Sequence, residues 1–157
     1  MRSQFILSCF FLFFIGEALI SGQAIKNSNG GDDAKAQVER VLRTQQDAWN
    51  RHDLEEFMAG YWNSPELTFF SGANEQHGWQ ATMDRYRATY ASAGHEMGKL
   101  EFSGLRIEML GTDAAFVRGT WLLTMSDGKT SHGLFTLIFR RFPEGWKIVH
   151  DHTSAAE

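Results

Sequence analysis

The sequence predicts one α+β domain in which helices come first and an antiparallel sheet follows. Apolar residues recur at helical spacing in the first half, whereas the chain from Leu100 onward alternates with a period close to two. Turn sequences then separate the alternating segments one after another, as between successive antiparallel strands. Helices segregated from strands in this way favour an α+β fold over a parallel sheet built from βαβ units.

The first half of the chain carries the predicted helices. Asp32 or Asp33 precedes the first apolar stripe as a capping residue, and Asp53 is placed to cap a second helix. Pro65 ends that second helix because proline cannot continue it. The predicted elements are a helix that starts at Ala34 and whose apolar face reaches His52, a helix over Leu54–Tyr61, a short strand over Glu66–Phe70, a loop over 71–78 and a helix over Trp79–Tyr90.

The second half carries four predicted strands separated by turns. They span Leu100–Leu110 with a slip near Gly104, Ala114–Met125, Thr130–Phe142 and Trp146–Ser154. Both faces of the strand over 114–125 carry bulky residues, whereas an antiparallel sheet with one free face shows a polar stripe. We therefore expect helices on one face and part of a second subunit on the other, which predicts a homodimer.

Residues 1–24 are a predicted signal peptide. A positive charge near the start precedes an apolar run, Phe5–Ile15, and small residues near Ala24 suit a signal peptidase. The run has about 11 residues and Glu17 comes soon after it, whereas a membrane span needs roughly 20. We expect export to the periplasm or the extracellular space, with no stable membrane span after cleavage. A retained membrane anchor is the alternative.

Composition narrows the function classes further. Residues 25–33 are polar and contain glycine, which is typical of a flexible tether, so residues 34–154 remain as the domain. The single cysteine, Cys9, lies in the predicted signal peptide, so the exported part has no disulfide, thiol nucleophile or thiolate metal site. The formal net charge of −4 gives no basic footprint for nucleic acid.

Three motifs in this chain resemble the nuclear transport factor 2-like (SnoaL-like) superfamily. They are AWNRHDL at 48–54, where His52 takes the place of a usual glycine, GTDAAFV at 111–117 and GWKIVHDHTS at 145–154. The last is similar to the end of the calcium/calmodulin-dependent protein kinase II association domain and to the bacterial domain of unknown function 4440. The resemblance implies a cone of three N-terminal helices packed on a curved, mainly antiparallel sheet, a fold that hosts many functions.

The resemblance implies site positions that can be compared one by one. Ketosteroid isomerases of this fold use a tyrosine on the first helix, an aspartate base after the first strand and a second acid in the third long strand. Gln45, Phe70 and Leu137 stand near those places, so the acid and base groups of that reaction are missing. The pocket arginines of the kinase association domain correspond to Thr120 and Leu137. We therefore expect neither steroid isomerisation nor that domain's ligand.

Side chains of the helices are the first candidates for a ligand pocket. Aromatic residues at helical spacing are more often part of a core, and a buried amide must bond either to the protein or to a ligand. The candidates from this half of the chain are Gln45, Tyr61, Trp62, Trp79 and Tyr86.

The strands supply charged and polar candidates. Arg118 and Thr120 share one side of a strand, where the guanidinium either binds a carboxylate-bearing ligand or forms a salt bridge. His150 and His152 share a face because they are two residues apart, and they either serve structure or act as polar groups of the pocket. A metal site needs further ligands that the sequence does not place beside them, so no metal or cofactor is expected.

Three functions are compatible with these residues. We expect an exported domain of uncharacterised function with a small-molecule-binding pocket. The alternative is an acid/base enzyme (isomerase, cyclase, dehydratase or hydrolase) on a small organic substrate, which requires an imidazole and another titratable group to converge in the cavity. A third hypothesis is an oligomerisation module like the kinase association domain.

Overall fold

The structure, a computed structural model, describes residues 28–92 and 95–156. Its elements are α1 (Ser28–Asn50), α2 (Leu54–Met58), β1 (Thr68–Ser71), β2 (Asn74–His77), α3 (Trp79–Tyr86), a π-helical segment η1 (Arg87–Ala91), β3 (Lys99–Met109), β4 (Ala114–Thr124), β5 (Thr130–Phe142) and β6 (Gly145–Ala155). The predicted signal peptide and residues 25–27 of the predicted tether lie outside the described residues. No helix among the described residues is long and apolar enough to cross a membrane.

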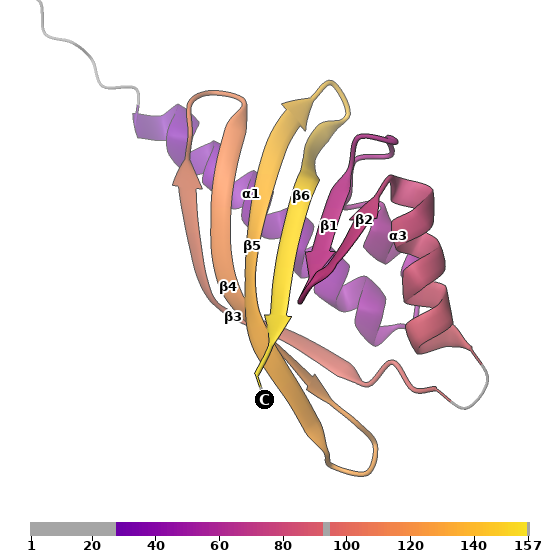
Figure 1. Cartoon of the computed structure of the whole chain (residues 1–157). Coiled ribbons are helices and arrows are strands. Elements are labelled where there is room, and N and C mark those ends of the chain that lie inside the picture. Colours follow the sequence, from indigo (N-terminus) through magenta and orange to yellow (C-terminus); the bar gives the residue numbers. More distant parts are fainter. Residues whose placement is uncertain (1–27, 93–94, 157) are drawn as a thin grey trace, which may run out of the picture.

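The six strands form one sheet in the order β2-β1-β6-β5-β4-β3. Neighbouring strands are antiparallel except β1 and β6, which run parallel. In Figure 1 the long strands curve strongly, α1 crosses the sheet obliquely and α3 lies beside the β1–β2 hairpin. The predicted slip near Gly104 is present, because the pairing of β3 with β4 shifts between Ser103 and Arg106. The predicted α+β class, with three helices on a curved and mainly antiparallel sheet, is confirmed.

The first helix is amphipathic as predicted but begins earlier. Its buried face consists of Ala34, Val38, Leu42, Gln45, Ala48 and Trp49. Because α1 starts at Ser28, residues 28–33 of the predicted tether are helical, and both Asp32 and Asp33 lie inside the helix instead of capping it. Once packing has fixed the apolar stripe, each further residue adds a backbone hydrogen bond at low cost, so the helix extends into exposed turns. There the Gln37 amide donates to Asp33 Oδ2 at 2.7 Å.

The second helix ends at Met58, three residues before its predicted end. The residues after it bond to β6 instead of continuing the helix. The Ile148 N–H donates to the Gly60 carbonyl at 3.0 Å, and the Trp62 N–H donates to the Ile148 carbonyl at 2.9 Å. Tyr61, between these two bonds, is thereby held against the sheet.

The segment between β1 and η1 also differs from the prediction. Residues 74–77 of the predicted loop form β2, an edge strand antiparallel to β1. Its sequence, NEQH, is polar throughout, so it lacks the apolar alternation that reveals a strand. The third helix is α-helical only to Tyr86 and continues as the π-helical segment η1.

The turn between α1 and α2 carries a strained residue. His52 has a φ of 62°, and Asp53 beside it caps α2, since its Oδ1 accepts a 2.9 Å hydrogen bond from the Glu56 N–H. Left-handed backbone costs a non-glycine residue roughly 1 kcal/mol. We expect His52→Gly to raise the free energy of unfolding by about 0.5–1 kcal/mol, measured by urea denaturation. His52→Ala, which keeps the Cβ, is the control; equal midpoints for the two variants would contradict the explanation.

Candidate functional site

A cavity of about 220 Å³ lies between the helices and the sheet. Its wall is mostly apolar and aromatic, with Trp49 from α1, Phe57 from α2, Phe69 from β1 and Tyr86 from α3 among the lining residues. The Phe57 and Phe69 rings meet the Tyr86 ring edge to face, with centroids 5.1 and 5.6 Å away. Edge-to-face pairs at this separation are favourable, so the rings hold one another in place around the cavity.

One buried carboxyl group interrupts the apolar wall. Asp151 on β6 is 5% exposed, and its Oδ2 accepts a 2.7 Å hydrogen bond from the Tyr61 hydroxyl. The other oxygen, Oδ1, is buried without a hydrogen-bond partner. Such an oxygen is costly unless something bonds to it. Asp151, a residue of the cavity lining, therefore has one satisfied carboxyl oxygen and one that lacks a partner.

Burial dominates the protonation of this group. It raises the pKa of Asp151 to about 7, while the hydrogen bond from Tyr61 and the charge of Arg85 act in the opposite direction. Burial, reinforced by Asp151, also raises the pKa of Tyr61 and of Tyr86 above the usual value. Removal from water disfavours the charged form of an acid. Asp151 therefore exchanges its proton near neutral pH, beside two phenols that remain protonated.

Arg85 on α3 brings a cation to the same cavity. Its Cζ stands 5.2 Å from the centroid of the Phe69 ring, a separation at which a guanidinium and an aromatic face attract. Its Nη1 is buried and has no hydrogen-bond partner. Since the guanidinium stays charged and offers five N–H donors, Arg85 brings a buried donor without a partner to the residues that line the cavity.

Three of the predicted pocket residues meet at this cavity: Gln45, Tyr61 and Tyr86. The Gln45 amide donates to the Phe57 carbonyl at 3.0 Å, so this nitrogen is bonded to the protein. Gly60 makes room for it, because a Cβ at that position would lie 2.6 Å from the Gln45 Cδ. The predicted polar group of α1 is thus at the cavity, fixed by the turn after α2.

The two predicted tryptophans lie outside the cavity lining. Trp62 stacks on Phe142, with ring centroids 5.3 Å apart and planes 18° from parallel. The Trp79 indole N–H donates to the Met58 carbonyl at 2.9 Å and so ties α3 to the end of α2. Both serve packing between elements and do not contact the cavity.

Arg118 and Thr120 face away from the cavity, on the outer side of β4. Arg118 is about half exposed and pairs with Glu108 on β3, with 3.7 Å between Nη2 and Oε2. The Thr120 hydroxyl lies 2.7 Å from the Ser103 hydroxyl. The salt-bridge interpretation of Arg118 therefore holds, and this arginine does not reach a molecule inside the cavity.

His150 and His152 also lie on the outer face, opposite Asp151. The His150 Nδ1 is 2.6 Å from the Thr68 hydroxyl, and both imidazoles contact the edge or face of Phe70. Partial burial and then the neighbouring His152 lower the pKa of His150. Among the residues that the structure describes, no imidazole lines the cavity beside its titratable groups. The described residues also contain no group of three His, Cys, Asp or Glu side chains placed to hold a metal ion.

A β-bulge explains why Asp151 could not be recognised from the sequence. The pairing of β5 with β6 shifts where Ile138 faces His150 and Phe139 faces Ile148, so Val149 is an extra residue in β6. Strict alternation from the buried Ile148 would turn His150 inward and Asp151 outward. The bulge reverses this order. Arg85 was missed for another reason, because a single arginine among polar residues of a helix carries no sequence signal.

The Tyr61–Asp151 hydrogen bond is expected to contribute measurably to stability. In Tyr61→Phe the ring remains but the donor is lost, which leaves a second buried carboxyl oxygen unpaired and costs about 1–3 kcal/mol. Because this bond lowers the pKa of Asp151, the variant should also show a higher pKa for that group. Urea denaturation and NMR titration of the carboxyl measure the two effects. A Tyr90→Phe variant, which removes a phenol hydroxyl from another residue of the cavity lining, is the control, and an equal loss in both would argue against a specific bond.

Comparison with known proteins identifies similar sequences and structures. A family model described as SnoaL-like domain matches residues 38–157. No curated protein matches the chain. A solved NTF-2 like protein of unknown function from Shewanella oneidensis is 34% identical, with a TM-score of 0.71 over 76% of this chain and 98% of that one.

Two further solved structures share the fold. A cystatin-like fold protein from Burkholderia xenovorans is 28% identical, with a TM-score of 0.62 over 78% of this chain and 92% of that one. A structure from Thiobacillus denitrificans, named for the calcium/calmodulin-dependent protein kinase type II association domain, is 20% identical, with a TM-score of 0.63 over 76% of this chain and 94% of that one. At 20% identity, the likeness to the Thiobacillus denitrificans structure concerns the fold alone.

Proposed function

The chain belongs to the SnoaL-like (nuclear transport factor 2-like) family, and we propose that it binds a small organic molecule in the cavity between its helices and sheet. One observation supports this proposal above the others: a mostly apolar cavity is lined by Asp151 and Arg85, each of which has a buried polar atom without a hydrogen-bond partner. Ligand sites in proteins are typically apolar cavities with a few placed polar groups.

A fragment screen followed by NMR tests this proposal. The protein comprising residues 25–157 contains every described element, and bound fragments should shift the backbone signals of cavity residues such as Phe69. Ser71 lines the cavity, so Ser71→Phe should fill it and abolish these shifts. Ser131→Phe, the same substitution at an exposed position of β5, should leave them unchanged. Fragments that bind elsewhere, or equally to both variants, would count against the cavity.

Acid/base catalysis in the same cavity is the second candidate function. It rests on Asp151, whose pKa of about 7 suits a general base near neutral pH, with Tyr61 as its hydrogen-bonding neighbour. The predicted imidazole base is replaced in this proposal by a carboxyl. Exchange of C–H protons next to the carbonyl of a cavity-bound ketone, followed by NMR in deuterium oxide, tests it. Exchange at the same rate in wild type and Asp151→Asn would exclude Asp151 as the base.

We also propose that a second copy of the chain covers the outer face of the sheet. Leu134 and Ile138 are 62% and 37% exposed there, and Phe116 lies opposite Ile138 on the neighbouring strand. Exposed apolar patches of this kind commonly mark interfaces. Light scattering after size exclusion should give a dimer for the wild type and a monomer for Leu134→Asp. Leu110→Asp, at an exposed leucine in the turn after β3, should stay dimeric; a monomeric wild type at micromolar concentration contradicts the proposal.

Export remains a proposal that rests on the first 24 residues alone. Their charged, apolar and small-residue order is that of a signal peptide. Cleavage after Ala24 would release a chain that starts at Ile25. Mass determination of the protein recovered from outside the cytoplasm tests this, and an uncleaved N-terminus in the membrane fraction would favour the anchor instead.

A further inference from the structure

We infer that the ligand of the cavity is a small organic acid. One oxygen of its carboxylate accepts a hydrogen bond from Arg85, and the other oxygen lies at Asp151. This inference rests on the proposed binding function and adds the chemical class of the ligand. Two residues of the cavity lining carry it, Arg85 and Asp151, because each has a buried polar atom, Nη1 and Oδ1, without a hydrogen-bond partner. One is a donor that carries a full positive charge, and the other belongs to a group that can hold a proton.

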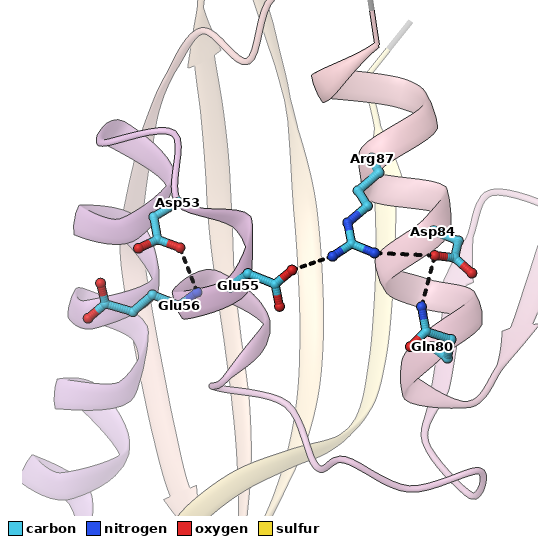
Figure 2. Close-up of polar contacts among 6 residues, drawn as sticks. All are labelled: Asp53, Glu55, Glu56, Gln80, Asp84 and Arg87. Carbon is cyan, nitrogen blue, oxygen red and sulfur yellow. Dashed lines mark hydrogen bonds and ion pairs between the residues drawn. The ribbon is translucent and has the colours of Figure 1, made fainter.

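The arginine is the stronger of the two indications. No described carboxylate lies within ion-pair distance of Arg85. Two residues further on, Arg87 bonds to Glu55 and lies 3.6 Å from Asp84 (Figure 2). A buried guanidinium donor without a partner is costly, and an anion with planar paired oxygens is its best complement. A carboxylate on the ligand gives Arg85 the negatively charged partner that Glu55 and Asp84 give Arg87.

Asp151 fits this anion in its neutral form. An ionised carboxylate beside a second one is repelled, whereas a protonated carboxyl donates a hydrogen bond to it. Burial makes that form accessible near neutral pH, since it raises the pKa of Asp151 to about 7. The charged or titratable groups that face it are Tyr61 after α2 and Arg85 and Tyr86 on α3. Tyr61 occupies Oδ2, so Oδ1 is the oxygen that remains for the ligand.

The rest of the cavity wall determines the size and polarity of the part of the acid that carries the carboxylate. Its wall is mainly aromatic and aliphatic, with Leu100, Phe102 and Leu137 from the sheet facing the rings of the helices. A cavity of roughly 150 Å³ already accommodates benzene. A cavity of about 220 Å³ therefore suits one aromatic ring, or a short alkyl chain, that bears a single acid group.

Calorimetric titration with matched acids and amides tests the inference. The probes are benzoate and phenylacetate, each compared with its neutral amide, on the protein of residues 25–157 at pH 6. The acids should bind at least about tenfold more tightly than the amides, because a charge-assisted hydrogen bond is worth that much. Arg85→Gln should remove the preference for the acid. Arg85→Met keeps an apolar side chain against Phe69 and should also remove the preference. Agreement of the two variants would show that a folding defect does not cause the loss.

Arg87→Gln is the matched control, because Arg87 is exposed and already paired; it should bind the acids as the wild type does. If acids and amides bind equally and shift cavity signals in NMR, the cavity function stands and the Arg85 assignment is overturned. If no acid binds at millimolar concentration while neutral fragments do, the cavity function again stands and the Arg85 assignment is overturned. An equal loss of acid binding in Arg85→Gln and Arg87→Gln likewise contradicts a specific role for Arg85.

Discussion

The substitution Asp151→Asn is expected to abolish most of the change in stability between pH 4 and pH 8. The wild-type Asp151 has a pKa of about 7 in the folded protein against an ordinary value of 3.8. The folded state therefore binds this proton more strongly than the unfolded state does. The stability gained by protonation is fully present below about pH 4 and is lost as the pH rises toward 7. A pKa change of this size corresponds to roughly 4 kcal/mol.

Urea denaturation at pH 4 and pH 8 measures this effect. The wild type should lose stability between the two values, and Asp151→Asn should lose much less. His150 acts in the opposite sense, because its lowered pKa means that the folded state gives up a proton and gains stability as the pH rises. Only the difference between the two proteins therefore isolates the carboxyl. Asp113→Asn, at an exposed turn position, is the control. Parallel pH profiles for wild type and Asp151→Asn would show that Asp151 is not a buried acid.

Truncation of Phe139 to alanine is expected to cost about 3–5 kcal/mol, the range for a buried phenylalanine. Phe139 is fully buried on β5, where Ala115 of β4 and Ile148 of β6 flank it in the sheet. The lost side chain leaves a cavity that strands paired on both sides cannot close. A loss of this size is a large part of the stability of a typical domain.

Arg140→Ala is the matched control for Phe139→Ala, because Arg140 is the next residue on the same strand and is exposed. Surface substitutions of this kind usually change stability by less than about 0.5 kcal/mol. Urea midpoints for the two variants compare them directly. A small and equal effect for both would contradict the burial of Phe139 in a tightly packed core.

The fold was predictable because its signals are periodic. The stripe of α1, the four long strands and the slip near Gly104 are each visible in the sequence and present in the structure. The start of α1 and the whole of β2 were not predictable in the same way. The start of α1 depends on the propagation of an already packed helix into polar residues, and β2 consists of polar residues at a sheet edge. Neither leaves a hydrophobic pattern to detect.

The candidate site was less predictable because a single bulge decides it. Alternation along β6 is a reliable guide only while every residue is paired, and the extra residue Val149 reverses the faces of His150 and Asp151. The histidines drew attention through their chemistry but lie on the outer face. Gln45, Tyr61 and Tyr86, proposed from helical spacing, line the cavity. Arg85 required the packed arrangement of α3 against β1 before its buried donor could be recognised.

A crystal structure of residues 25–157 with a bound organic acid would decide whether the cavity binds its ligand through Arg85 and Asp151. We expect electron density for the acid inside the cavity, with one oxygen of its carboxylate within hydrogen-bonding distance of Arg85 Nη1 and the other near Asp151 Oδ1. Density for the acid only on the outer face of the sheet, with Arg85 and Asp151 bonded to each other in the cavity, would contradict this binding mode.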